Sequence, residues 1–113
     1  MMQTVIDKDI QPGLLGSYFK MLVNRFFKIL PMRESGEKSV PEYIRSLQNE
    51  LVGVQNLVSG MENDPSIITL LAILEFLHDT PDCTIKETKR EVFRAISICN
   101  KLNAAYMGGD THE

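Results

Sequence analysis

Apolar residues fill almost every position from Ile67 to Leu77, where the chain reads IITLLAILEFL. Pro65 precedes this run and Pro81 follows it, and a proline disfavours helical backbone at the residue before it. A helix that is apolar on nearly every side is typical of a buried element. The run is also far shorter than the ~20 apolar residues that a membrane-spanning helix needs. The pattern therefore predicts a buried central helix at about residues 66–79.

A second apolar pattern extends from Leu14 to Leu30. Its polar residues recur three and four positions apart and form one stripe of a helix whose remaining surface is largely apolar. Pro31 limits this helix, which we place at about residues 14–30. Residues 1–12 are mostly polar and lack helical periodicity, so we expect a flexible N-terminal arm there.

A third pattern follows the polar stretch Arg33–Ser39, which is typical of a solvated loop. Ser39 and Glu42 have the spacing of a capping box, with Pro41 in the first turn. The apolar residues that follow alternate spacings of three and four, the seam of a helix that packs against a neighbour. These seam residues are Ile44, Leu47, Leu51, Val54, Val58 and Met61. The pattern predicts a helix at about residues 40–61.

The last helix begins after Thr84, where Thr84 and Glu87 repeat the capping-box spacing. We place it at residues 85–106 and expect the segment 108–113 to be a disordered tail. On a helical wheel, one face of this helix is apolar and a different face is basic. The apolar face comprises Ile85, Val92, Ala95, Ile96, Cys99, Leu102 and Tyr106.

Four helices with short connections predict an all-α fold, a compact bundle of four main helices. The length of 113 residues fits one domain. We therefore expect a single helical domain over residues 13–107, between the arm and the tail.

Charge and composition exclude few functions. The formal net charge of −3 gives the whole chain no attraction to nucleic acid or to an acidic membrane. Two cysteines are too few for a disulfide framework, and the first residues lack the pattern of a secretory signal, which indicates a cytoplasmic protein. No phosphate-binding loop, dinucleotide turn, HExxH or GxSxG motif occurs, so we expect no enzyme activity, catalytic residue or cofactor.

The basic face of the last helix is the first candidate site, because it concentrates positive charge that the net charge hides. Under a purely structural interpretation, this face is exposed to solvent and is stabilised by ion pairs such as Glu87 with Arg90 and Glu91 with Arg94. Its functional interpretation is a protein-binding surface, because an exposed aromatic residue rimmed by cations resembles an interface hot spot. The candidate contact residues are Lys86, Lys89, Arg90, Phe93, Arg94, Ile98 and Lys101 on this helix, together with Phe27 on the first.

The first helix is a second candidate, since it is basic and rich in aromatic residues. Such a helix could lie on a membrane surface, but its wide apolar face is also what a bundle core or a dimer needs. We expect the core interpretation to hold. Phe27 projects beside the polar stripe and is the residue expected to touch something outside the fold.

Two further interpretations remain open. The apolar helix, the short turn and the basic helix resemble the opening of a winged helix-turn-helix domain, which would make the protein a nucleic-acid-binding regulator acting through the basic face of residues 85–106. His78, Asp79, Asp82 and Cys83 crowd one turn, but their spacing matches no strong zinc motif, so we expect no metal site.

The strings FKILPMRE, Phe27–Glu34, and KREVFRAISICNKL, Lys89–Leu102, resemble those of small uncharacterised helical proteins from Gram-positive bacteria and their prophages. This resemblance implies a mobile-element protein, a class in which short chains commonly bind another protein. It brings no catalytic residues to carry over.

Together these observations predict a small non-enzymatic protein-binding module from a phage or mobile element. It would act stoichiometrically on a host or phage protein, as an inhibitor or an assembly adaptor. Self-association as a homodimer through the helix at 14–30 or the helix at 40–61 is a further expectation.

Overall fold

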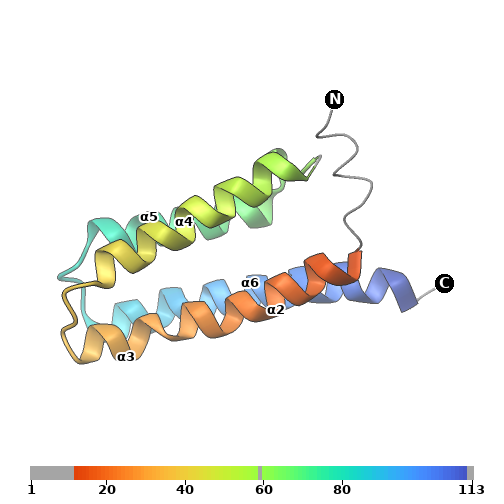
Figure 1. The fold of residues 1–113 in the computed structure, drawn as a ribbon. Coiled ribbons are helices and arrows are strands. Elements are labelled where there is room, and N and C mark those ends of the chain that lie inside the picture. Colours follow the sequence, from red (N-terminus) through yellow and green to blue (C-terminus); the bar gives the residue numbers. More distant parts are fainter. Residues whose placement is uncertain (1–11, 59, 112–113) are drawn as a thin grey trace.

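The computed structural model describes residues 12–58 and 60–111, and all the regular structure in these residues is helical (Figure 1). The elements are α2 (Pro12–Phe27), α3 (Ile29–Glu34), α4 (Val40–Leu57), the short 3₁₀ helix η1 (Met61–Asn63), α5 (Pro65–Asp79) and α6 (Ile85–Thr111). The predicted all-α fold of four main helices is confirmed, with α3 as a short continuation of α2.

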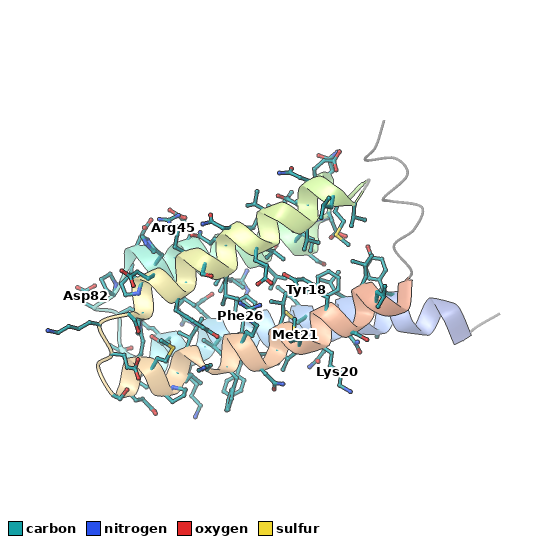
Figure 2. The ribbon with its side chains drawn as sticks, in the orientation of Figure 1. Tyr18, Lys20, Met21, Phe26, Arg45 and Asp82 are labelled. Carbon is teal, nitrogen blue, oxygen red and sulfur yellow. The ribbon has the colours of Figure 1, made fainter. Side chains whose placement is uncertain are left out.

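The helices form two layers. In one layer α2 and α3 lie alongside α6, and in the other α4 lies alongside α5 (Figure 1). Each helix turns its apolar stripe toward the space between the layers, where the side chains form one continuous core. Its largest fully buried members include Phe19, Phe26, Ile44, Leu47, Ile67, Leu74 and Leu77. Figure 2 shows Phe26 directed toward the α4–α5 layer and Lys20 directed away from it.

Pro31 does not end the first helical segment, as the sequence had suggested. The interruption lies at Lys28, because Pro31 has no N–H to donate to the carbonyl of Phe27. Helical backbone then resumes at Ile29 and continues to Glu34, with Pro31 in the first turn, where a missing N–H costs little. The solvated loop is therefore shorter than predicted.

The second helix starts as predicted at Val40 but ends at Leu57. Val58 is extended, and Gly60 has a positive φ of 89° that leads into η1. The predicted capping box at Ser39 is wrong, since the Ser39 hydroxyl contacts Glu37 Oε1 at 3.3 Å and caps no helical N–H. The predicted seam is confirmed at Ile44, Leu47 and Leu51, which are buried. Val54 and Val58 are partly buried, and Met61 is buried from η1 rather than from α4.

The remaining helix starts follow their sequence signals. Asp64 caps α5 by accepting a hydrogen bond from the backbone N–H of Ser66 at 2.8 Å. The capping box of α6 is present in both directions: Glu87 N–H donates to Thr84 Oγ1 at 3.0 Å, and Thr84 N–H donates to Glu87 Oε1 at 3.2 Å. Reciprocal capping of this kind fixes where α6 begins.

The apolar helix α5 is not buried on every side, which corrects the prediction of a fully wrapped helix. Leu70, Leu74 and Leu77 are buried, but Ile68 and Phe76 are 48% and 39% exposed. The reason is the two-layer architecture, in which neighbouring helices cover only part of the circumference of α5. No helix among the described residues is long and apolar enough to cross a membrane.

The predicted ends of the domain fall partly outside the described residues. The backbone of α6 is helical to Thr111, five residues beyond the predicted end at Tyr106, so the predicted tail is helical over its first four residues. Residues 1–11, 59 and 112–113 lie outside the described chain, and with them nearly all of the predicted arm.

Candidate protein-binding surface

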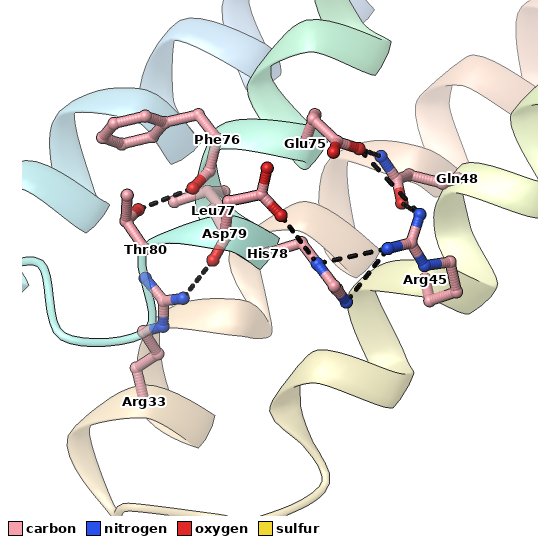
Figure 3. A network of polar contacts seen from close by, with 9 residues as sticks. All are labelled: Arg33, Arg45, Gln48, Glu75, Phe76, Leu77, His78, Asp79 and Thr80. Atoms are coloured by element: carbon pink, nitrogen blue, oxygen red, sulfur yellow. Dashed lines mark hydrogen bonds and ion pairs between the residues drawn. The ribbon is translucent and has the colours of Figure 1, made fainter.

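Arg33 joins the two layers at the end where α3, α5 and α6 meet (Figure 3). Its guanidinium donates hydrogen bonds to the backbone carbonyl of Leu77, near the C-terminus of α5, and to Thr88 Oγ1 at 3.0 Å. It also contacts Cys83 Sγ at 3.2 Å. The sequence had placed Arg33 at the edge of a solvated loop, but it instead holds the helix ends that support the candidate surface.

A second polar network joins α4 to α5 (Figure 3). Gln48 donates to Glu75 Oε1 at 2.8 Å, and Arg45 donates to Gln48 Oε1 at 2.8 Å. Arg45 also lies 3.2 Å from His78, whose Nδ1 is 3.1 Å from Asp79 Oδ1. The hydrogen bond with His78 lowers the pKa of the Asp79 carboxyl.

In the turn that carries His78, Asp79, Asp82 and Cys83, the His78 and Cys83 side chains contact other protein residues. His78 engages Arg45 and Asp79, whereas Cys83 engages Arg33 and Thr88. Over residues 12–58 and 60–111, no group of three or more His, Cys, Asp or Glu side chains is arranged to hold a metal ion.

Phe27 on α2 and Phe93 on α6 meet on the outside of their layer. Their ring centroids are 6.1 Å apart, and the two residues are 49% and 44% exposed. Lys89 Nζ lies 6.0 Å from the centroid of Phe93, within the range of a cation–π contact. The sequence singled out both phenylalanines on separate helices, and the antiparallel packing of α2 against α6 brings them together.

Two shallow grooves adjoin Phe93. One, of about 400 Å³, lies between α2–α3 and α6 and is lined by Phe27, Leu30, Pro31, Glu34, Lys89 and Phe93. The other, of about 600 Å³, lies over the first turns of α6 and is lined by Thr84, Lys86, Glu87, Lys89, Arg90 and Phe93. Lys89 and Phe93 line both, so the grooves are adjacent. We call these ten residues the aromatic surface.

The structure separates the predicted contact residues into three groups. Phe27, Lys86, Lys89, Arg90 and Phe93 belong to the aromatic surface. Arg94 is exposed but lines a different groove, beside Phe76 of α5, and Lys101 is exposed about 12 Å farther along α6 than Phe93. Ile98 is partly buried against the core and so is a poor anchor for an external partner.

Glu91 forms ion pairs with two of the cations on the basic face of α6, Arg90 and Arg94. Its carboxylate is 3.2 Å from Arg94 and 3.5 Å from Arg90. The expected pair of Glu87 with Arg90 is absent among the described ion pairs, because Glu87 caps the helix instead. Lys86 and Lys89 have no ion-pair partner within the described part of the chain.

The aromatic residues of the first helix divide between the core and the surface. Phe19 and Phe26 are fully buried, so the aromatic residues of α2 chiefly form the core rather than a membrane-facing surface. The apolar seams of α2 and α4 also contribute to the core, while Leu14 and Met21 of α2 and Val52 and Leu57 of α4 are exposed. The homodimer remains a prediction.

Sequence reasoning missed Leu30, Pro31 and Glu34 as parts of a groove. They were assigned to a helix end and a loop, because Pro31 was taken as the limit of the helix. The one available signal was the spacing of four between Phe27 and Pro31, which aligns them on a continuing helical path.

Comparisons with protein-family models, with curated proteins and with solved structures found no match.

Proposed function

We propose that this chain is a small non-enzymatic protein-binding module that contacts its partner through the aromatic surface. It acts stoichiometrically, as an inhibitor or an assembly adaptor for a host or phage protein. The observation that carries the proposal is the pairing of two exposed aromatic rings from different helices, Phe27 and Phe93, beside cationic side chains.

Physical properties of this pair favour binding. Aromatic residues supply large contact areas at low cost in side-chain entropy, and they are enriched at the centres of interfaces. Phe26 and Val92, the residues that precede the two rings in sequence, are fully buried, so the backbone beneath each ring is held by the core. A surface fixed before binding loses little entropy when a partner arrives.

The proposed mobile-element origin rests on the resemblance of Phe27–Glu34 and Lys89–Leu102 to small uncharacterised helical proteins of Gram-positive bacteria and their prophages. The six residues that line the groove between α2–α3 and α6 all fall within these two strings. The segments that carry the resemblance are thus the segments that build this groove.

The test is affinity capture from a lysate of a Gram-positive host, treated with nuclease, with mass spectrometry of the retained proteins. Phe93→Ala should reduce recovery of the specific partner by about tenfold or more, because truncating an interface anchor costs 2 kcal/mol or more. Phe76→Ala is the matched control, since Phe76 is 39% exposed but lies on α5, outside the aromatic surface. Equal recovery with both variants would refute the assignment of this surface.

A nucleic-acid-binding regulator is the second candidate. It is favoured by the exposed cations Lys86, Arg90, Arg94 and Lys101 along α6. The pairing of Glu91 with two of these cations weakens it. Affinity for duplex DNA that falls steeply as salt rises, by release of counterions from phosphates, would support this alternative. Capture of a protein that survives nuclease treatment and moderate salt would exclude it as the main function.

A further inference from the structure

The two layers of the fold carry opposite charge. Residues 12–34 and 85–111, which form the α2–α3–α6 layer, contain nine lysines and arginines and four acidic residues, a formal charge of +5. Residues 40–79, which form the α4–α5 layer, contain one arginine and six acidic residues, a formal charge of −5. The net charge of −3 conceals this separation, which becomes visible only when the helices are assigned to layers (Figure 1).

The aromatic surface lies on the positive layer, and its ten residues include three cations and two carboxylates, Glu34 and Glu87, a formal charge of +1. Lys86, Lys89 and Arg90 line the larger groove, with Glu87 as the one carboxylate there. Glu87 is engaged in capping α6, and neither lysine has an ion-pair partner within the residues described. A partner that carries carboxylates beside its apolar anchors would pair with Lys86 and Lys89, whereas a basic partner would be repelled.

The backbone of the surface restricts the shape of the partner. The surface is built mainly from the side chains of α2, α3 and α6, and the described chain presents no strand edge there. An extended peptide would therefore find no strand with which to form a ladder of backbone hydrogen bonds. A helix arrives with its own backbone bonds satisfied and presents apolar residues at spacings of three and four.

We propose that the aromatic surface receives an acidic amphipathic helix, whose apolar residues pack on Phe27 and Phe93 and whose carboxylates face Lys86, Lys89 and Arg90. This inference rests on the proposed protein-binding function and specifies the partner's chemistry. The inference can be refuted while the protein-binding proposal stands, because a partner of another charge could still bind Phe27 and Phe93.

The experiment uses the ¹⁵N-labelled full chain and three synthetic helical peptides of equal length. The peptides share leucine anchors at positions i, i+3, i+4 and i+7 and differ only in their flanking residues, which are glutamate, glutamine or lysine. The glutamate peptide should shift the amide resonances of Phe27, Lys89 and Phe93. It should also bind at least about tenfold more tightly than the lysine peptide at low salt.

A charge reversal gives the sharper test. The double variant Lys86→Glu/Lys89→Glu should invert the order of affinities, so that the lysine peptide binds more tightly than the glutamate peptide. Lys101→Glu is the matched control, because Lys101 is an exposed cation of the same helix outside the surface, and it should leave the order unchanged. Far-ultraviolet circular dichroism verifies that each variant is folded.

Four outcomes would overturn the inference. Equal affinity for the three peptides, with shifts at Phe27 and Phe93, would refute the acidic partner but leave the protein-binding function standing. Absence of any shift with the glutamate peptide at millimolar concentration would refute it directly. Shifts that appear on concentrating the protein alone would identify a second copy as the occupant, and stronger shifts with duplex DNA than with the glutamate peptide would identify a nucleic acid.

Discussion

Arg33 reaches from α3 to the C-terminal end of α5, where its guanidinium donates a hydrogen bond to the backbone carbonyl of Leu77. Carbonyls in the last turn of a helix lack partners within the helix, and a cation there also interacts favourably with the helix dipole. The same guanidinium bonds Thr88 of α6 at 3.0 Å. One side chain therefore links α3 to both α5 and α6.

Replacing this arginine should destabilise the fold. We expect Arg33→Ala to lower the free energy of unfolding by about 2 kcal/mol in urea titrations, because it leaves partly buried acceptors without their charged donor. Arg33→Lys should restore only part of the loss, since an ammonium group cannot present the planar fork of donors. Arg45→Ala is the control and should cost less than about 1 kcal/mol, because Arg45 is an exposed residue. Equal losses for Arg33→Ala and Arg45→Ala would contradict the linking role.

The two predicted capping boxes behave differently and provide a matched pair. Thr84→Ala should lower stability by about 1 kcal/mol, because Thr84 Oγ1 accepts the hydrogen bond from Glu87 N–H at 3.0 Å. Ser39→Ala should change stability by less than about 0.5 kcal/mol, since Ser39 caps no helix. Thermal unfolding of the two variants side by side measures the difference, and a larger loss for Ser39→Ala would show that the caps are misassigned.

Two glycines should respond to alanine with opposite signs. Gly53 lies within α4, and a Cβ added there would meet nothing within 4 Å, so Gly53→Ala should stabilise the protein by about 0.5–1 kcal/mol. Gly60 has a φ of 89°, a conformation that alanine adopts only at a cost, so Gly60→Ala should destabilise it by about 1–2 kcal/mol. Chemical denaturation of both variants tests this, and shifts of the same sign would refute it.

The buried thiol of Cys99 should make the fold sensitive to alkali. Burial raises the pKa of this thiol from its ordinary value near 9 to about 12. The unfolded state therefore loses the thiol proton at a lower pH than the folded state does. Its contribution to stability is therefore fully present below about pH 8.5 and is lost as pH rises toward 12. Burial also raises the pKa of Tyr18, which acts in the same direction.

Thiol alkylation gives a direct measurement of that burial. At pH 8, iodoacetamide should label Cys83, which is only partly buried, well before Cys99, which is fully buried. Cys99 should react only after urea unfolds the chain. Mass spectrometry of partially labelled protein distinguishes the two sites, and simultaneous labelling would show that the core around Cys99 opens readily.

Local patterns predicted the parts of the fold that depend on neighbouring residues. The helix from Pro65 to Asp79, the capping box at Thr84 and the buried seam of α4 all follow from apolar spacing and capping chemistry within a few residues. The errors arose where an isolated signal competed with tertiary packing. Pro31 was taken as a helix end, although the chain continues past it because Ile29 and Leu30 are buried in the core.

The candidate surface was predictable only in its components. Phe27 and Phe93 were each identified by their position off the core face, but no spacing connects residues 66 positions apart in the chain. Ile98 was expected to lie away from the core but packs partly against it, because a helical wheel cannot show which neighbouring helix covers a given direction. Arg33 was assigned to solvent for the same reason, since its acceptors lie on α5 and α6.

The all-helical class of this protein, the positions of most of its helices and the apolar face of each could be predicted from the sequence, because these properties follow from residue spacing along a single helix. The tertiary structure decided which helices are neighbours, and so brought Phe27 to Phe93, placed Arg33 on Leu77 and separated charge into two layers. The physical reason is that packing selects one pairing of helix faces among several that the same apolar stripes would allow.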